Sequence, residues 1–229
     1  MHVKENIRPQ VDLSGNINNS NLILGLDVST KTIGIALFEE NNGSGDLKLL
    51  KYVSPKVKPE PENKMEELFE KARIFEKEFL NDYADVGITR VIIEEPLLQS
   101  NNVNTVATLL RFNGMIARSV YETIGIVPEF ISSYDARKYG FPQLMGIRTV
   151  KKDGTPKSEK DIKKAKPTLF GAYDNDVDKK MVIWEMVADL EPQITWFYDK
   201  KNKLTKENFD MTDSYVAVLG FMRKHGYWK

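Results

Sequence analysis

The order of the hydrophobic runs constrains the fold of this chain more than any other feature of its sequence. Residues 22–28, 32–38 and 47–53 are short runs rich in β-forming side chains, and residues 41–45 have the composition of a turn between the last two. Three strands joined this tightly predict an antiparallel meander. Residues 1–20 are polar and show no periodicity, so we expect a flexible N-terminal arm before the meander.

After the meander the pattern changes to alternating helices and strands. Apolar side chains recur at helical spacing from Met65 to Phe79, after a proline-rich stretch at residues 55–61. Further elements are expected at residues 88–94 (strand), 103–124 (helix), 126–131 (strand), 178–190 (helix) and 211–224 (helix). This alternation implies parallel pairing with right-handed crossovers. The predicted fold is α/β, a five-stranded mixed sheet (βββαβαβ) flanked by helices. That is the RNase H-like plan, and the glycine-rich loop of a dinucleotide-binding fold is missing.

Composition excludes several classes of protein. The chain has no cysteine, so disulfide scaffolds and thiolate metal sites are excluded, and oxygen or imidazole must bind any metal. No apolar run approaches the roughly 20 residues that span a bilayer. The first residues also lack the apolar core of a signal peptide, so we expect a cytoplasmic protein that does not bind a membrane.

Charge is balanced overall but uneven along the chain. The 33 basic and 33 acidic residues cancel, yet from Arg148 to Lys166 eight basic residues face three acidic ones. Such a run is usually a solvated loop, although it can also bind phosphate groups. We interpret residues 146–178 as a basic insertion within a single domain at residues 21–229.

Asp27 is a charged residue inside the apolar run at residues 22–28. Strand alternation places it on the same face as Gly25, which we expect to leave room for a ligand. An unpaired carboxylate is costly to bury, so Asp27 needs a cation, hydrogen bonds or access to water. The alternative is that Asp27 only organises the following turn, which begins at Ser29.

Three further acidic residues have comparable positions. Glu94 ends the apolar run at residues 88–94, and a parallel crossover can place this strand beside the first one, close to Asp27. Asp210 and Asp213 precede an apolar helical run and share one side of its first turn. Ordinary alternatives exist here too: Glu94 as a solvated strand-end acid, and the two aspartates as a near capping box.

These four acids point to a metal site if the fold brings them together. Carboxylates about 4–6 Å apart raise one another's pKa or require divalent cations, and oxygen ligands without Cys or His favour Mg²⁺ or Mn²⁺. We therefore predict that two Mg²⁺ ions, replaceable by Mn²⁺, are held by the catalytic residues Asp27, Glu94, Asp210 and Asp213. No small-molecule cofactor is expected.

The same segments resemble a known family. Residues 25–34, Gly-Leu-Asp-Val-Ser-Thr-Lys-Thr-Ile-Gly, resemble the first-strand motif of the RuvC-like Holliday junction resolvases, which belong to the RNase H-like or retroviral integrase superfamily. Residues 92–95 are similar to the family's fourth-strand glutamate, residues 210–218 to its paired C-terminal aspartates, and residues 130–139 to the segment after its fifth strand. The N-terminal arm and the basic insertion depart from the family pattern.

The resemblance implies a Mg²⁺-dependent endodeoxyribonuclease of DNA recombination and repair, in which water attacks a phosphodiester in line. Its implied substrate is branched DNA, a four-way (Holliday) junction that a two-fold homodimer resolves by paired symmetric nicks. Residues that could contact DNA, each of them equally an ordinary surface residue, are Lys31, Asn101, Asn102, Asn104, Arg137, Lys138, Lys151 and Lys152. Phe112, Tyr134 and Phe141 could stack on open bases or belong to the core.

Other functions remain open from the sequence. An RNase H-like nuclease for RNA–DNA hybrid or other branched DNA would share the metal site and differ only in its surfaces. A branched-DNA binding module without turnover would not need four acids. Actin-like and sugar-kinase ATPases resemble residues 25–34 as well, but they require a second such domain and further glycine-rich loops that this chain lacks.

Overall fold

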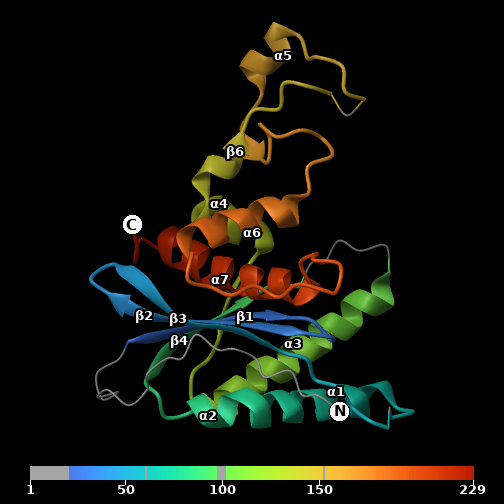
Figure 1. Cartoon of the computed structure of the whole chain (residues 1–229), viewed down its shortest axis with the longest axis vertical. Coiled ribbons are helices and arrows are strands. Elements are labelled where there is room, and N and C mark those ends of the chain that lie inside the picture. Colours follow the sequence, from blue (N-terminus) through green and yellow to red (C-terminus); the bar gives the residue numbers. More distant parts are fainter. Residues whose placement is uncertain (1–20, 60, 97–101, 152) are drawn as a thin grey trace.

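A five-stranded mixed sheet lies at the centre of the molecule (Figure 1). The computed structural model describes residues 21–59, 61–96, 102–151 and 153–229; the expected N-terminal arm lies outside these residues. The strand order is β3-β2-β1-β4-β5, with antiparallel pairing among the first three strands along the chain and parallel pairing of β1 with β4 and of β4 with β5. The strands are β1 (Leu22–Val28), β2 (Ile33–Asn41), β3 (Ser44–Val53), β4 (Ile88–Glu94) and β5 (Glu129–Ile131). The predicted α/β fold and its strand order along the chain are confirmed.

Two strand boundaries differ from the prediction for identifiable reasons. The turn between β2 and β3 needs only Asn42 and Gly43, whose positive φ angles of 48° and 81° are those of a tight two-residue hairpin. Both strands are therefore longer than expected. β5 is shorter than expected because the chain, after the left-handed C-cap of the preceding helix at Gly125 (φ 80°), joins the sheet only at Glu129.

Helices on one face of the sheet enclose a mostly apolar core. They are α1 (Lys64–Phe75), η2 (Glu76–Leu80), α2 (Asn81–Tyr83) and α3 (Val103–Ile124). Alternate β1 residues, among them Leu24 and Leu26, pack here against Phe75 and Phe112, all of them fully buried. We call this side the apolar face. Phe112 is thus a core residue, and its proposed role in stacking on bases is wrong.

Helices α4 (Ser133–Gly140), α6 (Lys179–Leu190) and α7 (Lys206–Lys224) cover the other face. α7 lies directly on the backbone of the sheet: a Cβ atom at Gly25 would stand 2.4 Å from the Ser214 carbonyl oxygen, and one at Gly34 2.0 Å from the Asp210 carbonyl oxygen. The prediction that Gly25 leaves room for a ligand is therefore wrong, because the backbone of α7 fills that space. We call this side the α7 face.

The start of α7 also differs from the prediction. The helix begins at Lys206 with Thr205 at its N-cap, five residues before the expected start at Met211. Its first turn is polar in sequence, yet Asn208 is fully buried, since its side-chain amide accepts from the Phe197 N–H at 3.0 Å and donates to the Phe197 carbonyl at 2.6 Å. This contact with a distant loop extends the helix beyond the apolar periodicity.

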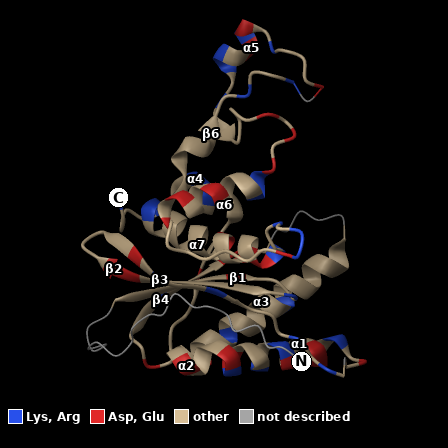
Figure 2. Ribbon diagram, viewed as in Figure 1, with Lys and Arg blue, Asp and Glu red and all other residues tan. Residues whose placement is uncertain are grey.

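The basic insertion forms an arm that projects from the body of the molecule (Figures 1 and 2). Its base is the two-stranded ladder of β6 (Met145–Gly146) and β7 (Thr168–Leu169), which follows the short helix η3 (Pro142–Leu144), and α5 (Glu159–Lys164) lies near its tip. Phe141, just before the arm, is buried in the core of the α7 face, so its stacking role is also wrong. Within the described residues, no helix has the length and apolarity that crossing a membrane requires.

Candidate active site

The strand register brings Asp27 and Glu94 together on the α7 face. β1 pairs with β4 so that Leu26 lies opposite Ile93, which puts the next residues, Asp27 and Glu94, at the same level. Both are two residues beyond positions that face α7, namely Gly25 and Ile92. Strand alternation therefore directs both carboxylates toward α7.

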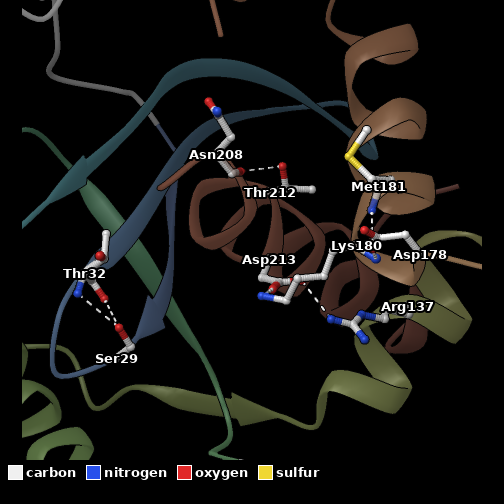
Figure 3. A network of polar contacts seen from close by, with 9 residues as sticks. All are labelled: Ser29, Thr32, Arg137, Asp178, Lys180, Met181, Asn208, Thr212 and Asp213. Carbon is white, nitrogen blue, oxygen red and sulfur yellow. Dashed lines mark hydrogen bonds and ion pairs between the residues drawn. The ribbon is translucent and has the colours of Figure 1, made fainter. Parts of the chain in front are cut away.

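The turn after β1 does not depend on Asp27. Ser29 holds it: the Ser29 hydroxyl donates to the Thr32 carbonyl at 2.8 Å and accepts from the Thr32 N–H at 3.0 Å (Figure 3). Asp27 lies on the strand before these bonds. The interpretation of Asp27 as the residue that organises the turn is therefore wrong.

Asp210 and Asp213 come to the same place from α7. Because α7 begins at Lys206, both lie inside the helix rather than at its start, and the capping-box interpretation is wrong. The Thr32 hydroxyl hydrogen-bonds Asp210, which ties the second turn of α7 to the start of β2. Asp213, one turn further on, is almost completely buried, at 6% exposure.

The carboxylates interact strongly with one another. Burial raises the pKa of Asp27 well above its usual value, and the nearby charges of Glu94, Asp213 and Asp210 raise it further. Burial, together with Asp213, raises the pKa of Glu94 to about 8, against an opposing effect of Arg137. Burial also raises the pKa of Asp210 to about 6. Folding thus places carboxyl groups where their charged form is costly, which is typical of a functional site.

Two cationic side chains face this cluster, and Figure 3 shows both of them beside Asp213. On α4, Arg137 donates from Nη2 to Asp213 Oδ1 at 3.0 Å, and the Nζ atom of Lys180, at the start of α6, lies 3.7 Å from Asp213 Oδ2. Asp178 caps α6 and accepts from the backbone N–H groups of Lys180 and Met181, which fixes the helix start that carries Lys180. With all groups ionised, four carboxylates and two cations leave an excess of two negative charges.

The donor set fits a hard divalent cation. All four anionic groups are carboxylates, as Mg²⁺ prefers. Glu94 Oε2 is buried and accepts no hydrogen bond from any described residue, so one oxygen lacks the partner that burial normally demands. Nevertheless, no three His, Cys, Asp or Glu side chains of the described chain are arranged to hold a metal ion. Both oxygens of Asp213 are turned toward protein cations, Arg137 and Lys180.

The residues proposed to contact DNA are not gathered in one place. Lys31 is exposed in the turn after β1, and Lys151 is exposed on the arm. Asn102 caps α3 and accepts from two backbone N–H groups, while Asn104 is exposed in the first turn of that helix. Lys138 Nζ lies 4.9 Å from the centre of the Tyr139 ring. Arg137 is held by Asp213, and Asn101 and Lys152 lie outside the described residues. Of the three aromatic candidates, Tyr134 is exposed.

Sequence reasoning missed three residues of this cluster. Lys180 follows an ordinary helix cap, and nothing in the sequence showed that the start of α6 meets α7. Ser133 hydrogen-bonds Glu94 and Thr32 hydrogen-bonds Asp210, and both resemble the polar residues common in turns and helix starts. A single signal was available: Ser133 lies two residues after a strand parallel to β4, and side chains that follow parallel strands collect at the same sheet edge.

Comparison with known proteins adds evidence about the fold. The sequence matches no protein-family model and no curated protein. The structure of Thermus thermophilus RuvC superposes with a TM-score of 0.50 at 13% identity, over 89% of this chain and 96% of that one. This chain has the fold of RuvC. T. thermophilus RuvC in complex with a Holliday junction substrate gives 0.49 at 9% identity, over 89% and 96% of the chains. The yeast mitochondrial Holliday junction resolvase Ydc2 gives 0.47 at 11%, over 94% and 83%.

Proposed function

We propose that this protein is a Mg²⁺-dependent endonuclease that resolves four-way DNA junctions by paired symmetric nicks. One observation carries the proposal: Asp27, Glu94, Asp210 and Asp213 come from three distant segments and face one another in a largely buried cluster on the RuvC fold. A structural protein gains nothing from four mutually repelling carboxylates, whereas a nuclease needs them to bind divalent cations.

Asp27, Glu94, Asp210 and Asp213 are the residues that would hold the metal. A bound Mg²⁺ supplies a Lewis acid beside the scissile phosphate and lowers the pKa of the attacking water. Asp27 would be the central ligand of this set, because Glu94, Asp210 and Asp213 all lie near enough to raise its pKa. The raised carboxyl pKa values mean that metal binding releases protons near neutral pH.

The two cations have separate roles in this proposal. Arg137 is a positioning residue: its side chain is only 17% exposed, and its bond to Asp213 orients that carboxylate. Lys180 is 53% exposed, so it can leave Asp213 and pair with a DNA phosphate that enters the site. A phosphate and a metal ion together would take over the contacts that now neutralise Asp213.

Paired nicks require two copies of the site. We propose a homodimer that forms through the end of the sheet beside α3, where Leu110 and Phe130 are 45% and 43% exposed and line a hollow with Pro96 and Gly114. Exposed apolar clusters of this kind often mark subunit contacts. Sedimentation of the wild type should give a dimer, and Leu110→Asp should shift it toward monomer while leaving the fold intact.

The proposed activity is tested on a set of labelled DNA substrates. Synthetic four-way junctions, forks, linear duplex and RNA–DNA hybrid are incubated with Mg²⁺ and resolved on denaturing gels. We expect wild type to cut junctions at two symmetric positions, leaving 5′ phosphates, and Asp27→Asn to be slower by roughly 10⁴-fold, about 5 kcal/mol at the transition state. Asp82→Asn, an exposed acid on the opposite side of the sheet, should cut normally.

Each substrate also tests an alternative. Cutting of the hybrid in preference to the junction would replace the proposal by an RNase H-like nuclease with the same metal site. Tight junction binding without cleavage in Mg²⁺ or Mn²⁺ would indicate a binding module. Equal activity of wild type and Asp27→Asn on the junction would reject the proposed site.

A further inference from the structure

A groove lined by six lysines opens directly beside the acidic cluster. The cavity has a volume of about 830 Å³ and runs between the β1–β2 turn, the segment after β3, α1, and the starts of α6 and α7. We call it the lysine groove, and its lysines are Lys31, Lys56, Lys58, Lys71, Lys180 and Lys206. Asp210 lines the same cavity, so the groove and the acidic cluster are continuous.

The groove carries an excess of positive charge. Three acids line it, Glu67, Glu207 and Asp210. Glu67 is already neutralised: it is 4% exposed and forms ion pairs with Lys64 and Lys71, whose hydrogen bonds lower its pKa. Lys71 also donates to the Thr30 carbonyl at 2.8 Å, so it is fixed within the groove wall. The five other lysines therefore face Glu207 and the acidic cluster alone.

Those five lysines are open to an incoming ligand. Lys31, Lys56, Lys58, Lys180 and Lys206 are all exposed. In the described chain, no carboxylate forms an ion pair with Lys31, Lys56 or Lys206, and Lys180 reaches only Asp213, at 3.7 Å. Lysines that are spread along one solvated helix face need no explanation, but these come from four separate segments and meet in one concave surface.

We propose that the lysine groove binds the sugar–phosphate backbone of the DNA strand whose scissile phosphate enters the acidic cluster. This rests on the proposed function, because it takes the acidic cluster to be the site of cleavage. Lysine ammonium groups bind phosphates as point charges without reading bases, so the groove contributes affinity and orientation but no sequence preference. Lys180 is shared by both sites and marks the junction between them.

The test removes three groove lysines that have no part in the acidic cluster. Lys56→Gln, Lys58→Gln and Lys206→Gln are combined in one variant, and binding of a fluorescent four-way junction is followed by anisotropy at several salt concentrations, with Ca²⁺ in place of Mg²⁺ to prevent turnover. Each lost phosphate contact lowers the slope of log affinity against log salt by about 0.9 on duplex DNA. We expect the slope to fall by about two to three and the affinity by roughly tenfold or more at low salt.

Two further variants separate the groove from general effects. Arg73→Gln, Lys77→Gln and Arg118→Gln remove the same charge from exposed positions outside the groove and should leave the slope close to that of wild type. Arginine at positions 56, 58 and 206 keeps the charge and should restore binding. If the glutamine triple melts at a lower temperature than wild type, Lys56→Gln and Lys206→Gln are measured singly. Each should lower the slope of log affinity against log salt by about 0.9.

The outcomes distinguish the groove from the nuclease proposal. If the groove triple and the control triple give equal slopes of log affinity against log salt, the proposal that the groove binds DNA is overturned, even if the wild type cuts junctions. A reduced slope in the groove triple, with a wild type that cuts no DNA, leaves the groove as a DNA-binding surface and rejects the nuclease. Loss of binding to single-stranded RNA alone, with DNA binding unchanged, would also overturn the inference.

Discussion

The two faces of the central sheet are built from the same strands but have opposite characters. On the apolar face, Leu24 and Leu26 of β1 pack against fully buried aromatic side chains. On the α7 face, Asp27 of the same strand meets three further acids and two cations. The comparison shows that stability and proposed activity are separated within one strand, residue by residue, so neighbouring substitutions should have opposite effects.

The strongest test of this separation pairs Leu26→Ala with Asp27→Asn. Leu26 is fully buried, so its truncation should lower the free energy of unfolding by about 2–5 kcal/mol. Asp27→Asn replaces a carboxylate that burial destabilises by a neutral group of the same size, and should leave stability unchanged or raise it. Urea unfolding in EDTA measures both. A loss in Asp27→Asn as large as that in Leu26→Ala would make Asp27 a structural anchor.

The next largest effect is expected at Arg137. Arg137→Gln leaves Asp213 without its closest cation and should cost about 2–3 kcal/mol in metal-free buffer, somewhat less than for a fully buried pair. Saturating Mg²⁺ should reduce the loss, since a bound cation replaces the missing charge. Arg118→Gln is the control: Arg118 pairs with Glu122 at 2.8 Å but is 74% exposed, so we expect at most about 0.5 kcal/mol. Equal losses with and without Mg²⁺ would contradict a metal site at Asp213.

A smaller effect on stability should follow from glycine substitutions on the two faces of the sheet. Gly34→Ala puts a Cβ atom 2.0 Å from the Asp210 carbonyl oxygen, so α7 must shift, at about 1–3 kcal/mol. Cleavage should fall further than stability, because Asp210 moves with the helix. Gly114 on α3 has open space around its Cα atom, and Gly114→Ala should stabilise by up to about 1 kcal/mol. Thermal melts and junction cleavage are measured for both variants. Unchanged cleavage in Gly34→Ala would show that the packing of α7 at Gly34 does not affect the position of Asp210.

The smallest effect for each unit of change is that of pH, and its sign follows from the raised pKa of Glu94. Between its ordinary value of 4.5 and about 8, the folded protein retains a proton that the unfolded chain has lost. The metal-free protein should therefore lose stability as pH rises through this window, by at most about 1.4 kcal/mol per pH unit for one group. Glu94→Gln should flatten the profile. A wild-type stability that rises over this range would contradict the assigned shift.

The sequence was sufficient for the parts of the molecule that periodicity governs. The bounds of β1, β4 and α3 were predicted correctly, because each is a regular apolar pattern with a clear end. The four acids were picked out because carboxylates are rare inside or next to apolar runs. Their roles as ligands stay a prediction, although the structure places them together.

The parts that failed depend on contacts between distant segments. The start of α7 was missed because Asn208 is stabilised by Phe197 and not by an apolar pattern. The role of Gly25 was wrong because close helix packing and ligand space require the same small residue. Lys180 and the lysine groove could not be foreseen, since five segments far apart in sequence form the groove only when the chain has folded.

The arm has a consequence for engineering. The segment of the arm between Gly146 and Thr168 begins and ends at residues that pair with each other in the β6–β7 ladder, so its two ends lie side by side. Such a segment can be excised and its ends joined by a tight turn, or exchanged for another of different length, while the cluster around Asp27 keeps its shape. Chimaeras made at this point would test whether the arm affects which substrate the proposed nuclease cuts.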